Sequence, residues 1–268
     1  MIGTQMHTLR WAAYGILFVA GSLAAASAAE PAAPPQAPAA APAPMTIADW
    51  WFNLIDTKSG KRIGGEHKVM QQQEKSTLVI QDRLAMAQKD ASVGYDCTVR
   101  YALQPSLAPV SGEVVTNVDG KRFLKGSFKL EGRVLTSTSS LTNADGSVLQ
   151  PEHTEKGDLP GKGLVLLPQG LEVIAPALLP AEGQRADITL VEFPARLDTM
   201  VAVDTGCRLV RSDLPDGSAR FQLVKGDTAQ LIWQYVLDAK GAIKEGTLYE
   251  TKFVPATRDE ATKPVTAG

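Results

Sequence analysis

Hydrophobic and polar residues alternate with a period of two through most of the chain between residues 46 and 255. For example, Leu124 and Phe128 share one face of a segment whose other face carries Lys125 and Lys129. A period of two is the repeat of a β-strand, in which successive side chains point to opposite sides. The pattern therefore predicts that strands make up most of this region.

Short turns centred on glycine separate the alternating segments. Glycine tolerates the positive φ that tight hairpin turns require, and Asp-Gly is a frequent hairpin pair. Sequential hairpins predict an all-β fold: one large, strongly curved antiparallel sheet, a half-barrel or open barrel, of about ten to twelve strands. The turns are TKSGK (57–61), NVDGK (117–121), LEGR (130–133), NADGS (143–147), PDGS (215–218) and DAKGA (238–242).

One apolar stretch, residues 157–183, interrupts the alternation. It contains four prolines, and only residues 169–178 are compatible with a short helix, with Leu171 and Ile174 on one side. Pro176 limits the length of that helix. We interpret the stretch either as a lid over the open end of the sheet or as a crossover whose apolar side completes the core.

The two ends of the chain differ in composition from the part between them. In residues 1–29, Arg10 precedes an apolar run and then small residues, which predicts a secretory signal peptide, with a retained membrane anchor as the alternative. Residues 30–45 are nearly all Ala and Pro and predict a disordered linker. We expect a single all-β domain over residues 46–255, a disordered tail over residues 256–268, and a periplasmic or secreted protein that does not span the membrane after cleavage.

Two cysteines, Cys97 and Cys207, each lie on the apolar face of a predicted strand. An oxidising compartment would permit one disulfide between them. The alternative is two buried free thiols that behave as small hydrophobic residues. We predict the disulfide.

Residue types that carry catalysis or metal binding are sparse. Beyond residues 1–29 the histidines are His67 and His153, and the chain contains no G-x-S-x-G, C-x-x-C or H-E-x-x-H motif. The formal net charge is −2 and basic residues form no cluster, which argues against a nucleic-acid partner. We therefore expect a protein that is not an enzyme and that has no metal site and no cofactor.

His67 is the histidine for which a special role is expected. Alternation places it on the more apolar face of residues 62–70, and a simple pairing with the next strand sets His67 opposite Ile80 and Gly65 opposite Asp82. His67 and Asp82 would then be diagonal neighbours on the inner face of the sheet. Such a pair either holds the register of the hairpin or contacts a ligand.

The segment from Trp51 to Gly64 reads W-x-x-x-I-D-x-x-S-G-K-R-I-G. Behind an export signal and before a series of hairpins, it resembles bacterial cell-envelope domains of unknown function that open with a Gly-Lys-x-Ile-Gly hairpin, here Gly60, Lys61, Ile63 and Gly64. The resemblance implies a curved antiparallel sheet, similar in outline to the periplasmic lipoprotein-carrier half-barrel. It implies no catalytic residue.

Two functions are compatible with these observations. The first is an exported, non-enzymatic envelope protein that binds an apolar or amphiphilic, lipid-like ligand within the curved sheet, with His67, Asp82, Leu171 and Ile174 as its contacts. The second is a structural or interaction module that binds envelope proteins or surface polysaccharide. A lined cavity beneath residues 164–180 would favour the first.

Overall fold

The computed structural model describes residues 44–73, 76–88, 91–104, 107–194, 200–226 and 229–265. The predicted signal peptide and residues 30–43 of the predicted linker lie outside these ranges. Neither of the two helices in the described ranges is long and apolar enough to cross a membrane.

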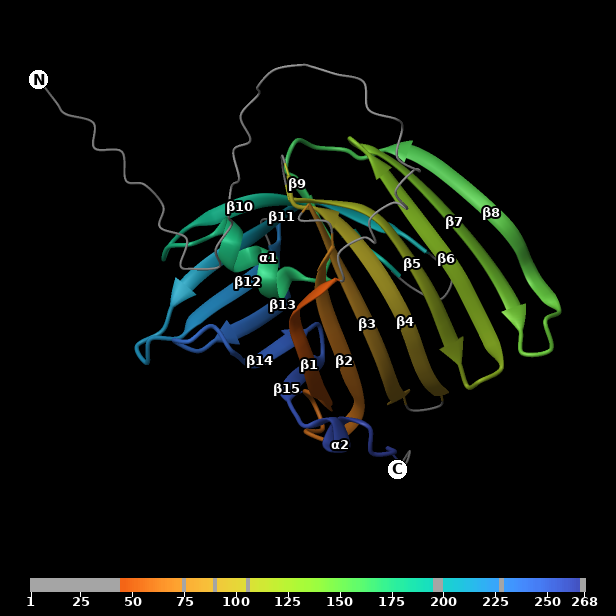
Figure 1. Ribbon diagram of the computed structural model, residues 1–268, viewed down its shortest axis with the longest axis horizontal. Helices are drawn as coiled ribbons and strands as arrows, with labels where there is room; N and C mark the ends of the chain where they lie inside the picture. The colour runs from red at the N-terminus through yellow and green to blue at the C-terminus, as the bar shows by residue number, and fades with distance from the viewer. Residues whose placement is uncertain are drawn as a thin grey trace, which may run out of the picture. The chain divides into compact units, whose positions relative to one another are not determined.

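Fifteen strands and two short helices follow one another along the described chain (Figure 1). The first eight strands are β1 (Met45–Asp56), β2 (Arg62–Gln73), β3 (Thr77–Gln88), β4 (Ala91–Ala102), β5 (Ala108–Val118), β6 (Arg122–Glu131), β7 (Val134–Asn143) and β8 (Val148–Asp158). After them come β9 (Leu164–Leu166), α1 (Leu171–Leu178), β10 (Arg185–Glu192), β11 (Ala202–Asp213), β12 (Ala219–Lys225), β13 (Gln230–Leu237), β14 (Ile243–Leu248), β15 (Thr251–Pro255) and α2 (Arg258–Ala261).

All fifteen strands belong to one sheet, in the order β8-β7-β6-β5-β4-β3-β2-β1-β15-β14-β13-β12-β11-β10-β9. Neighbours pair antiparallel except β9 and β10, and the pairing of β1 with β15 joins the two series of hairpins. The glycine of each predicted turn has a positive φ, for example 68° at Gly60 and 64° at Gly120. The predicted all-β fold with one large curved sheet is confirmed, although the sheet has more strands than expected.

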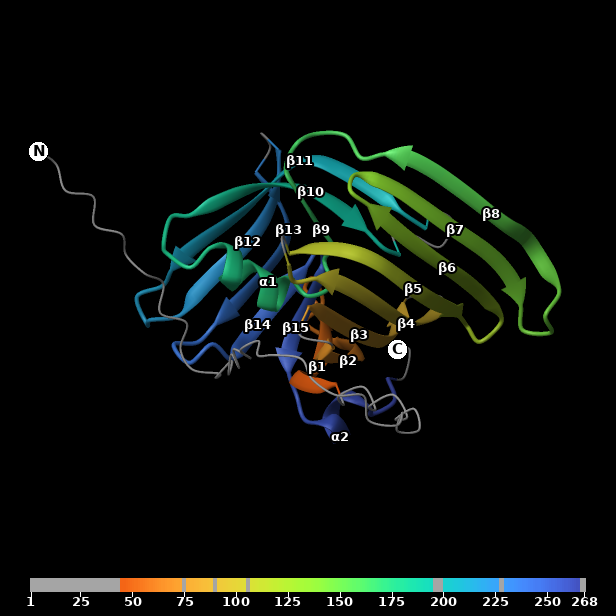
Figure 2. The same cartoon turned by 45° about the horizontal axis from the view of Figure 1, so that its top comes forward.

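The sheet curls without closing (Figures 1 and 2). Its edge strand β9 lies against β5 but is not the hydrogen-bonded neighbour of β5, so β6, β7 and β8 extend past the meeting point. Arg133, in the turn between β6 and β7, donates hydrogen bonds to the carbonyl oxygens of Pro160 at 2.7 Å and Gly163 at 2.9 Å. These bonds hold the segment before β9 against the first half of the sheet.

The core fills the inside of the curl. Phe128 on β6 packs edge-on against Phe193, with ring centroids 4.8 Å apart, and the predicted helix is present as α1. Leu171 and Ile174 of α1 are buried in this core. The apolar stretch therefore completes the core. This agrees with its interpretation as a crossover whose apolar side is buried.

The predicted disulfide is wrong. Cys97 on β4 and Cys207 on β11 are both free and both buried. In the sheet order β3, β2, β1, β15, β14, β13 and β12 lie between β4 and β11, so the two cysteines are not on neighbouring strands. The alternation located both cysteines on buried faces, but it held no information on which buried residues meet.

The predicted register between β2 and β3 is also wrong, and with it the predicted inner face of β2. Lys68, not Gly65, lies opposite Asp82, and Met70 lies opposite Ile80. The difference is three residues, and an odd shift turns every side chain of a strand to the other face. His67 therefore points to the outer side of the sheet and is not a neighbour of Asp82.

The structure describes the C-terminal segment as far as residue 265, and a short helix, α2, lies within the range for which a disordered tail is predicted. A capping box between Thr257 and Glu260 begins α2. The Arg62 guanidinium on β2 donates to the carbonyl oxygen of Ala261 at 2.8 Å. Gly65 permits this contact, because a Cβ there would lie 2.0 Å from the same oxygen.

Candidate functional site

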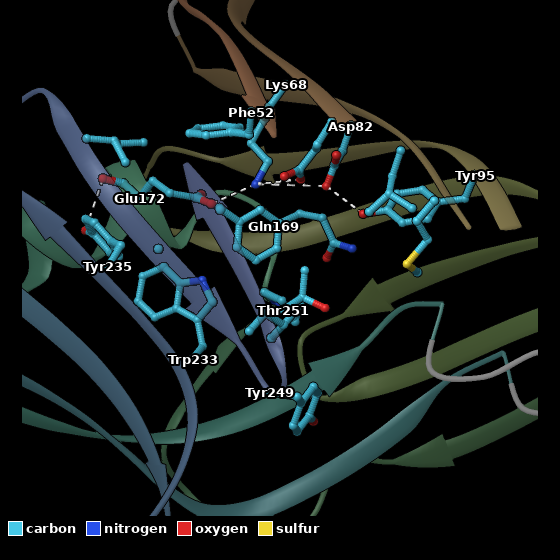
Figure 3. A pocket seen from close by; sticks show the side chains of 18 of the residues that line it. Phe52, Lys68, Asp82, Tyr95, Gln169, Glu172, Trp233, Tyr235, Tyr249 and Thr251 are labelled. Carbon is cyan, nitrogen blue, oxygen red and sulfur yellow. Dashed lines mark hydrogen bonds and ion pairs between the residues drawn. The ribbon is translucent and has the colours of Figure 1, made fainter. Parts of the chain in front are cut away.

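A cavity of about 430 Å³ lies inside the curl, between β2, β3 and β4 on one side and β13, β14 and β15 on the other, with residues before and within α1 completing its wall (Figure 3). Its size is in the range of small-molecule sites. The lining divides into a charged group of side chains and an aromatic group.

The charged group is centred on the buried ammonium of Lys68. Its Nζ lies 2.7 Å from Glu172 Oε1, 3.4 Å from Glu66 Oε1 and 4.0 Å from Asp82 Oδ2 (Figure 3). The side chains of Glu66, Lys68 and Asp82 are each 6% exposed or less. Three carboxylates thus surround one ammonium in a site from which water is largely excluded. We call these four residues the Lys68 cluster.

Strand geometry brings three members of the Lys68 cluster together. Glu66 and Lys68 share one face of β2 because residues i and i+2 of a strand point to the same side. Asp82 on β3 is the cross-strand partner of Lys68. Tyr95 on β4 is diagonal to Asp82, and its hydroxyl donates a hydrogen bond of 3.0 Å to Asp82 Oδ2.

The fourth member, Glu172, depends on how α1 is held. The Tyr101 hydroxyl on β4 donates to the carbonyl oxygen of Gln169 at 2.9 Å. The Tyr235 hydroxyl on β13 lies 3.1 Å from the carbonyl oxygens of Leu171 and Glu172. Two tyrosines from opposite halves of the sheet therefore position the start of α1 over the cavity.

Burial and charge shift the protonation equilibria of the cluster. Burial and the charge of Asp82 raise the pKa of the Glu66 carboxyl well above its usual value, against the opposing effect of Lys68. Burial by itself lowers the pKa of Lys68, but the surrounding carboxylates outweigh it and the pKa lies well above its usual value. Burial and Asp82 also raise the pKa of the Tyr95 hydroxyl. Lys68 therefore stays charged, and Tyr95 stays protonated, at neutral pH.

The hydrogen bonding of the cluster is incomplete. Glu172 Oε2 and Gln169 Oε1 are buried without a hydrogen-bond partner in the described part of the chain, whereas Glu66, whose raised pKa favours the protonated form, shares a hydrogen bond with Asp82. Buried polar atoms are normally paired because an unpaired one costs about 1–3 kcal/mol. In the described ranges no group of three His, Cys, Asp or Glu side chains has the arrangement of a metal site.

Aromatic side chains form the remaining wall. Trp233 and Tyr235 on β13 meet edge to face with centroids 4.4 Å apart, and Phe52 on β1 meets Phe253 on β15 at 6.3 Å. All four line the cavity. Figure 3 shows Trp233 and Tyr235 on the side of the cavity away from Asp82 and Tyr95.

The residues predicted to contact a ligand are separated by the structure. Asp82 lines the cavity, and its role as a ligand contact stays a prediction. Leu171 and Ile174 are buried in the core and are not among the described lining residues. His67 lies on the outer face, where its Nε2 is 2.8 Å from Asp49 Oδ1 and its ring stacks on Trp51 at 3.7 Å.

The sequence pattern did not identify the main cavity residues, because they are polar or distant in the sequence. The alternation that puts His67 on the inner face puts Glu66 and Lys68 on the outer face, because the alternate positions of that strand are more apolar. A usable signal was present: Asp82 interrupts an apolar strand face, and a buried carboxylate needs a cationic partner, which the neighbouring strand supplies in Lys68. Glu172 and the aromatic wall gave no such signal, because only the tertiary fold brings them near.

The outer face of β2 carries a second, more open groove of about 600 Å³ beside α2. Trp51 and His67 lie along it, and the guanidinium of Arg258 is 5.8 Å from the Trp51 ring centroid. Both side chains of the His67–Asp49 pair remain accessible to solvent, at 20% and 57%.

Comparison with known proteins finds similarity to solved structures only. No family model and no curated protein matches the chain. The crystal structure of a β-barrel-like protein of domain of unknown function DUF1849 from Brucella abortus is similar at a TM-score of 0.46 and 11% identity, over 78% of this chain and 94% of that chain. A DUF1089 family protein from Pseudomonas aeruginosa is similar at a TM-score of 0.38 and 16% identity, over 67% of this chain and 87% of that chain.

Proposed function

We propose that this protein binds a small amphiphilic molecule in the cavity inside its curled sheet. The observation that carries the proposal is the cavity itself: about 430 Å³, with an aromatic wall and a buried charged group whose hydrogen bonding is incomplete. An apolar portion of a ligand would be favoured by the aromatic wall. A polar portion would supply partners to the unpaired oxygens.

We propose binding without catalysis. The Lys68 ammonium is held by carboxylates and has a pKa well above its usual value, so it is not an amine nucleophile at neutral pH. Burial and the charge of Asp82 raise the pKa of the Cys97 thiol, and a buried thiol of raised pKa is unreactive. The polar groups are therefore suited to hold a ligand in one orientation.

We also propose that the protein is exported to the periplasm or beyond and that its ligand is lipid-like. The support for export is the pattern of residues 1–29, with a base, an apolar run and small residues in order. The support for a lipid-like ligand is the combination of an apolar wall with a polar end.

The experiment uses the neutral dye N-phenyl-1-naphthylamine, whose emission rises in apolar surroundings, with the full chain. Gly246 on β14 lines the cavity between Tyr235 and Phe253, and a Cβ there would meet its nearest neighbours only at ordinary contact distances, from 3.4 Å. A Leu side chain at this position would occupy the cavity, whereas Ala adds one methyl group.

We expect the wild-type chain to bind the dye, Gly246→Leu to weaken binding at least about tenfold through loss of cavity space, and Gly246→Ala to change it about twofold or less. Circular dichroism of each variant confirms that the sheet is retained. Absence of dye binding by the wild-type chain, or equal binding by Gly246→Leu, would overturn the proposal.

A further inference from the structure

The charges that line the cavity are unequal. Among the described lining residues, Glu66, Asp82, Glu172 and Glu250 are acidic and Lys68 is the only base, although the exposed Glu250 pairs with Lys58 at 2.6 Å. A ligand in the cavity therefore meets a predominantly negative surface, although the chain as a whole has a net charge of only −2.

Lys68 does not offer a site for an anion. Its ammonium donates to Glu172 at 2.7 Å and lies within 4.0 Å of Glu66 and Asp82, and its side chain is 6% exposed. Because carboxylates already surround it, an incoming anion would meet their charges as closely as that of the ammonium.

The Lys68 cluster lacks positive charge. With its three carboxylates ionised, one ammonium leaves two negative charges uncompensated, and protonation of one carboxyl still leaves one. An uncompensated buried charge is costly, and a cation in the cavity would reduce that cost. The unpaired carboxylate oxygen of Glu172 is an acceptor, so it matches a donor or a cation and not another acceptor, whereas Glu66, whose pKa is raised, can donate its proton to Asp82.

The aromatic wall favours the same kind of group. The negative face of an aromatic ring attracts an ammonium group, most strongly in a desolvated site, and aromatic cages recognise quaternary ammonium ligands. Trp233 and Tyr235, with ring centroids 4.4 Å apart, lie across the cavity from Asp82. Glu172, by contrast, lies beside Tyr235, whose hydroxyl is 3.1 Å from the Glu172 carbonyl oxygen. A cationic head group in the cavity would thus be within reach of both carboxylates and aromatic rings.

We propose that the amphiphile bound in this cavity carries an ammonium group, primary or quaternary, as its polar end. This inference rests on the proposed function, because it concerns the same cavity and the same ligand. The ammonium group occupies the space beside the Lys68 cluster, and the apolar chain extends away from the cluster along Trp233 and Phe253.

The test is isothermal titration calorimetry of the full chain at neutral pH with four probes: n-octyltrimethylammonium, n-octanol, n-octyl sulfate and tetramethylammonium. The first three share one apolar chain and differ in the charge of the head group, and the fourth is a cation without the chain. We expect n-octyltrimethylammonium to bind at least about tenfold more tightly than n-octanol, and n-octyl sulfate to bind more weakly than n-octanol. Tetramethylammonium should bind at least about tenfold more weakly than n-octyltrimethylammonium, because it lacks the apolar chain.

Two variants test the source of the preference. Asp82→Asn and Glu172→Gln each remove one charge with little change in shape, and each should lower the ratio of the n-octyltrimethylammonium affinity to the n-octanol affinity by about threefold to tenfold. Two are used so that one remains informative if the other does not fold. His67→Gln on the outer face is the control and should leave that ratio at its wild-type value.

The outcomes separate the two proposals. If no octyl probe binds, the proposed function fails. If n-octanol or n-octyl sulfate binds as tightly as n-octyltrimethylammonium, the cavity binds amphiphiles and the inference of a cationic head group is overturned. If tetramethylammonium binds as tightly as n-octyltrimethylammonium, the site recognises a free cation and the amphiphilic part of the inference is overturned.

Discussion

The two faces of β2 carry polar residues in opposite surroundings. On the inner face, Lys68 is surrounded by carboxylates and its side chain is 6% exposed. On the outer face, one residue earlier in the chain, His67 contacts Asp49 and Trp51 while solvent reaches the side chains of both His67 and Asp49. Two adjacent residues of one strand thus belong to two separate sites.

The difference shows that burial decides what each polar contact contributes. If a partner is lost on the outer face, water replaces it, so the contact adds little. If a partner is lost on the inner face, a charge remains in a medium that cannot solvate it. The same kind of ion pair therefore has a small effect on one side of β2 and a large effect on the other.

The largest effect is expected from Lys68→Met. Removal of the ammonium leaves three buried carboxylates without a counter-charge, and the free energy of unfolding should fall by about 3–5 kcal/mol, as measured by urea denaturation. The control is Lys129→Met, which removes an exposed lysine whose partner Glu131 is also exposed, and the midpoint should hardly move. An unchanged midpoint for Lys68→Met would show that the inner face is not electrostatically dependent on this residue.

A smaller effect is expected from Gly65→Ala on the outer face. Its Cβ would lie 2.0 Å from the carbonyl oxygen of Ala261, so α2 must move away. We expect a loss of about 1–3 kcal/mol and faster hydrogen exchange in residues 256–265. Gly94→Ala is the control, because its Cβ would meet only Leu84 O at 3.4 Å. Normal exchange protection of α2 in Gly65→Ala would contradict the close contact.

The pH dependence of stability should report on Glu66. Its pKa is raised in the folded state, so the folded chain holds this proton more tightly than the unfolded chain does. The contribution of Glu66 to stability is therefore complete below its ordinary pKa near 4.5 and is lost as the pH rises toward the folded value.

Glu66→Gln isolates this contribution because Gln cannot ionise. The free energy of unfolding of wild type minus that of Glu66→Gln should fall as the pH rises above the ordinary value near 4.5, as measured by urea denaturation. Subtraction cancels the titrating groups that do not interact with Glu66. A difference that is constant, or that rises with pH, would show that the Glu66 pKa is not raised.

The smallest effect is expected from His67→Ala. It removes the stack on Trp51 and the contact with Asp49, and it should cost about 0.5–1.5 kcal/mol in urea denaturation. The affinity for n-octyltrimethylammonium should equal that of the wild-type chain, because His67 does not line the inner cavity. A change in that affinity would show that the outer face of β2 influences ligand binding in the inner cavity.

Local patterns predicted the strands and turns well. The six glycine-centred turns adopt positive φ, because that backbone conformation depends on the residue itself and on its immediate neighbours. The helix at Leu171–Leu178 was likewise predicted from its own periodicity. The strand count was too low, although the class of fold was right.

Predictions that depended on pairing between segments were less successful. The rule that the more apolar face of a strand points inward placed His67 inside, because Ile63 and Val69 share its face and Glu66 and Lys68 occupy the other. The rule failed because the buried ammonium of Lys68 is paired with the carboxylates of Asp82 on β3 and Glu172 on α1.

Local sequence patterns predicted the class of fold, the positions of most turns, the short helix and the burial of both cysteines, because these follow from the conformational preferences and polarity of neighbouring residues. The same patterns did not predict the register of β2, the separation of Cys97 from Cys207 or the assembly of the Lys68 cluster with its aromatic wall. Those features depend on contacts between residues distant in the chain, and a shift of the pairing by an odd number of residues is enough to exchange the inner and outer faces of a strand.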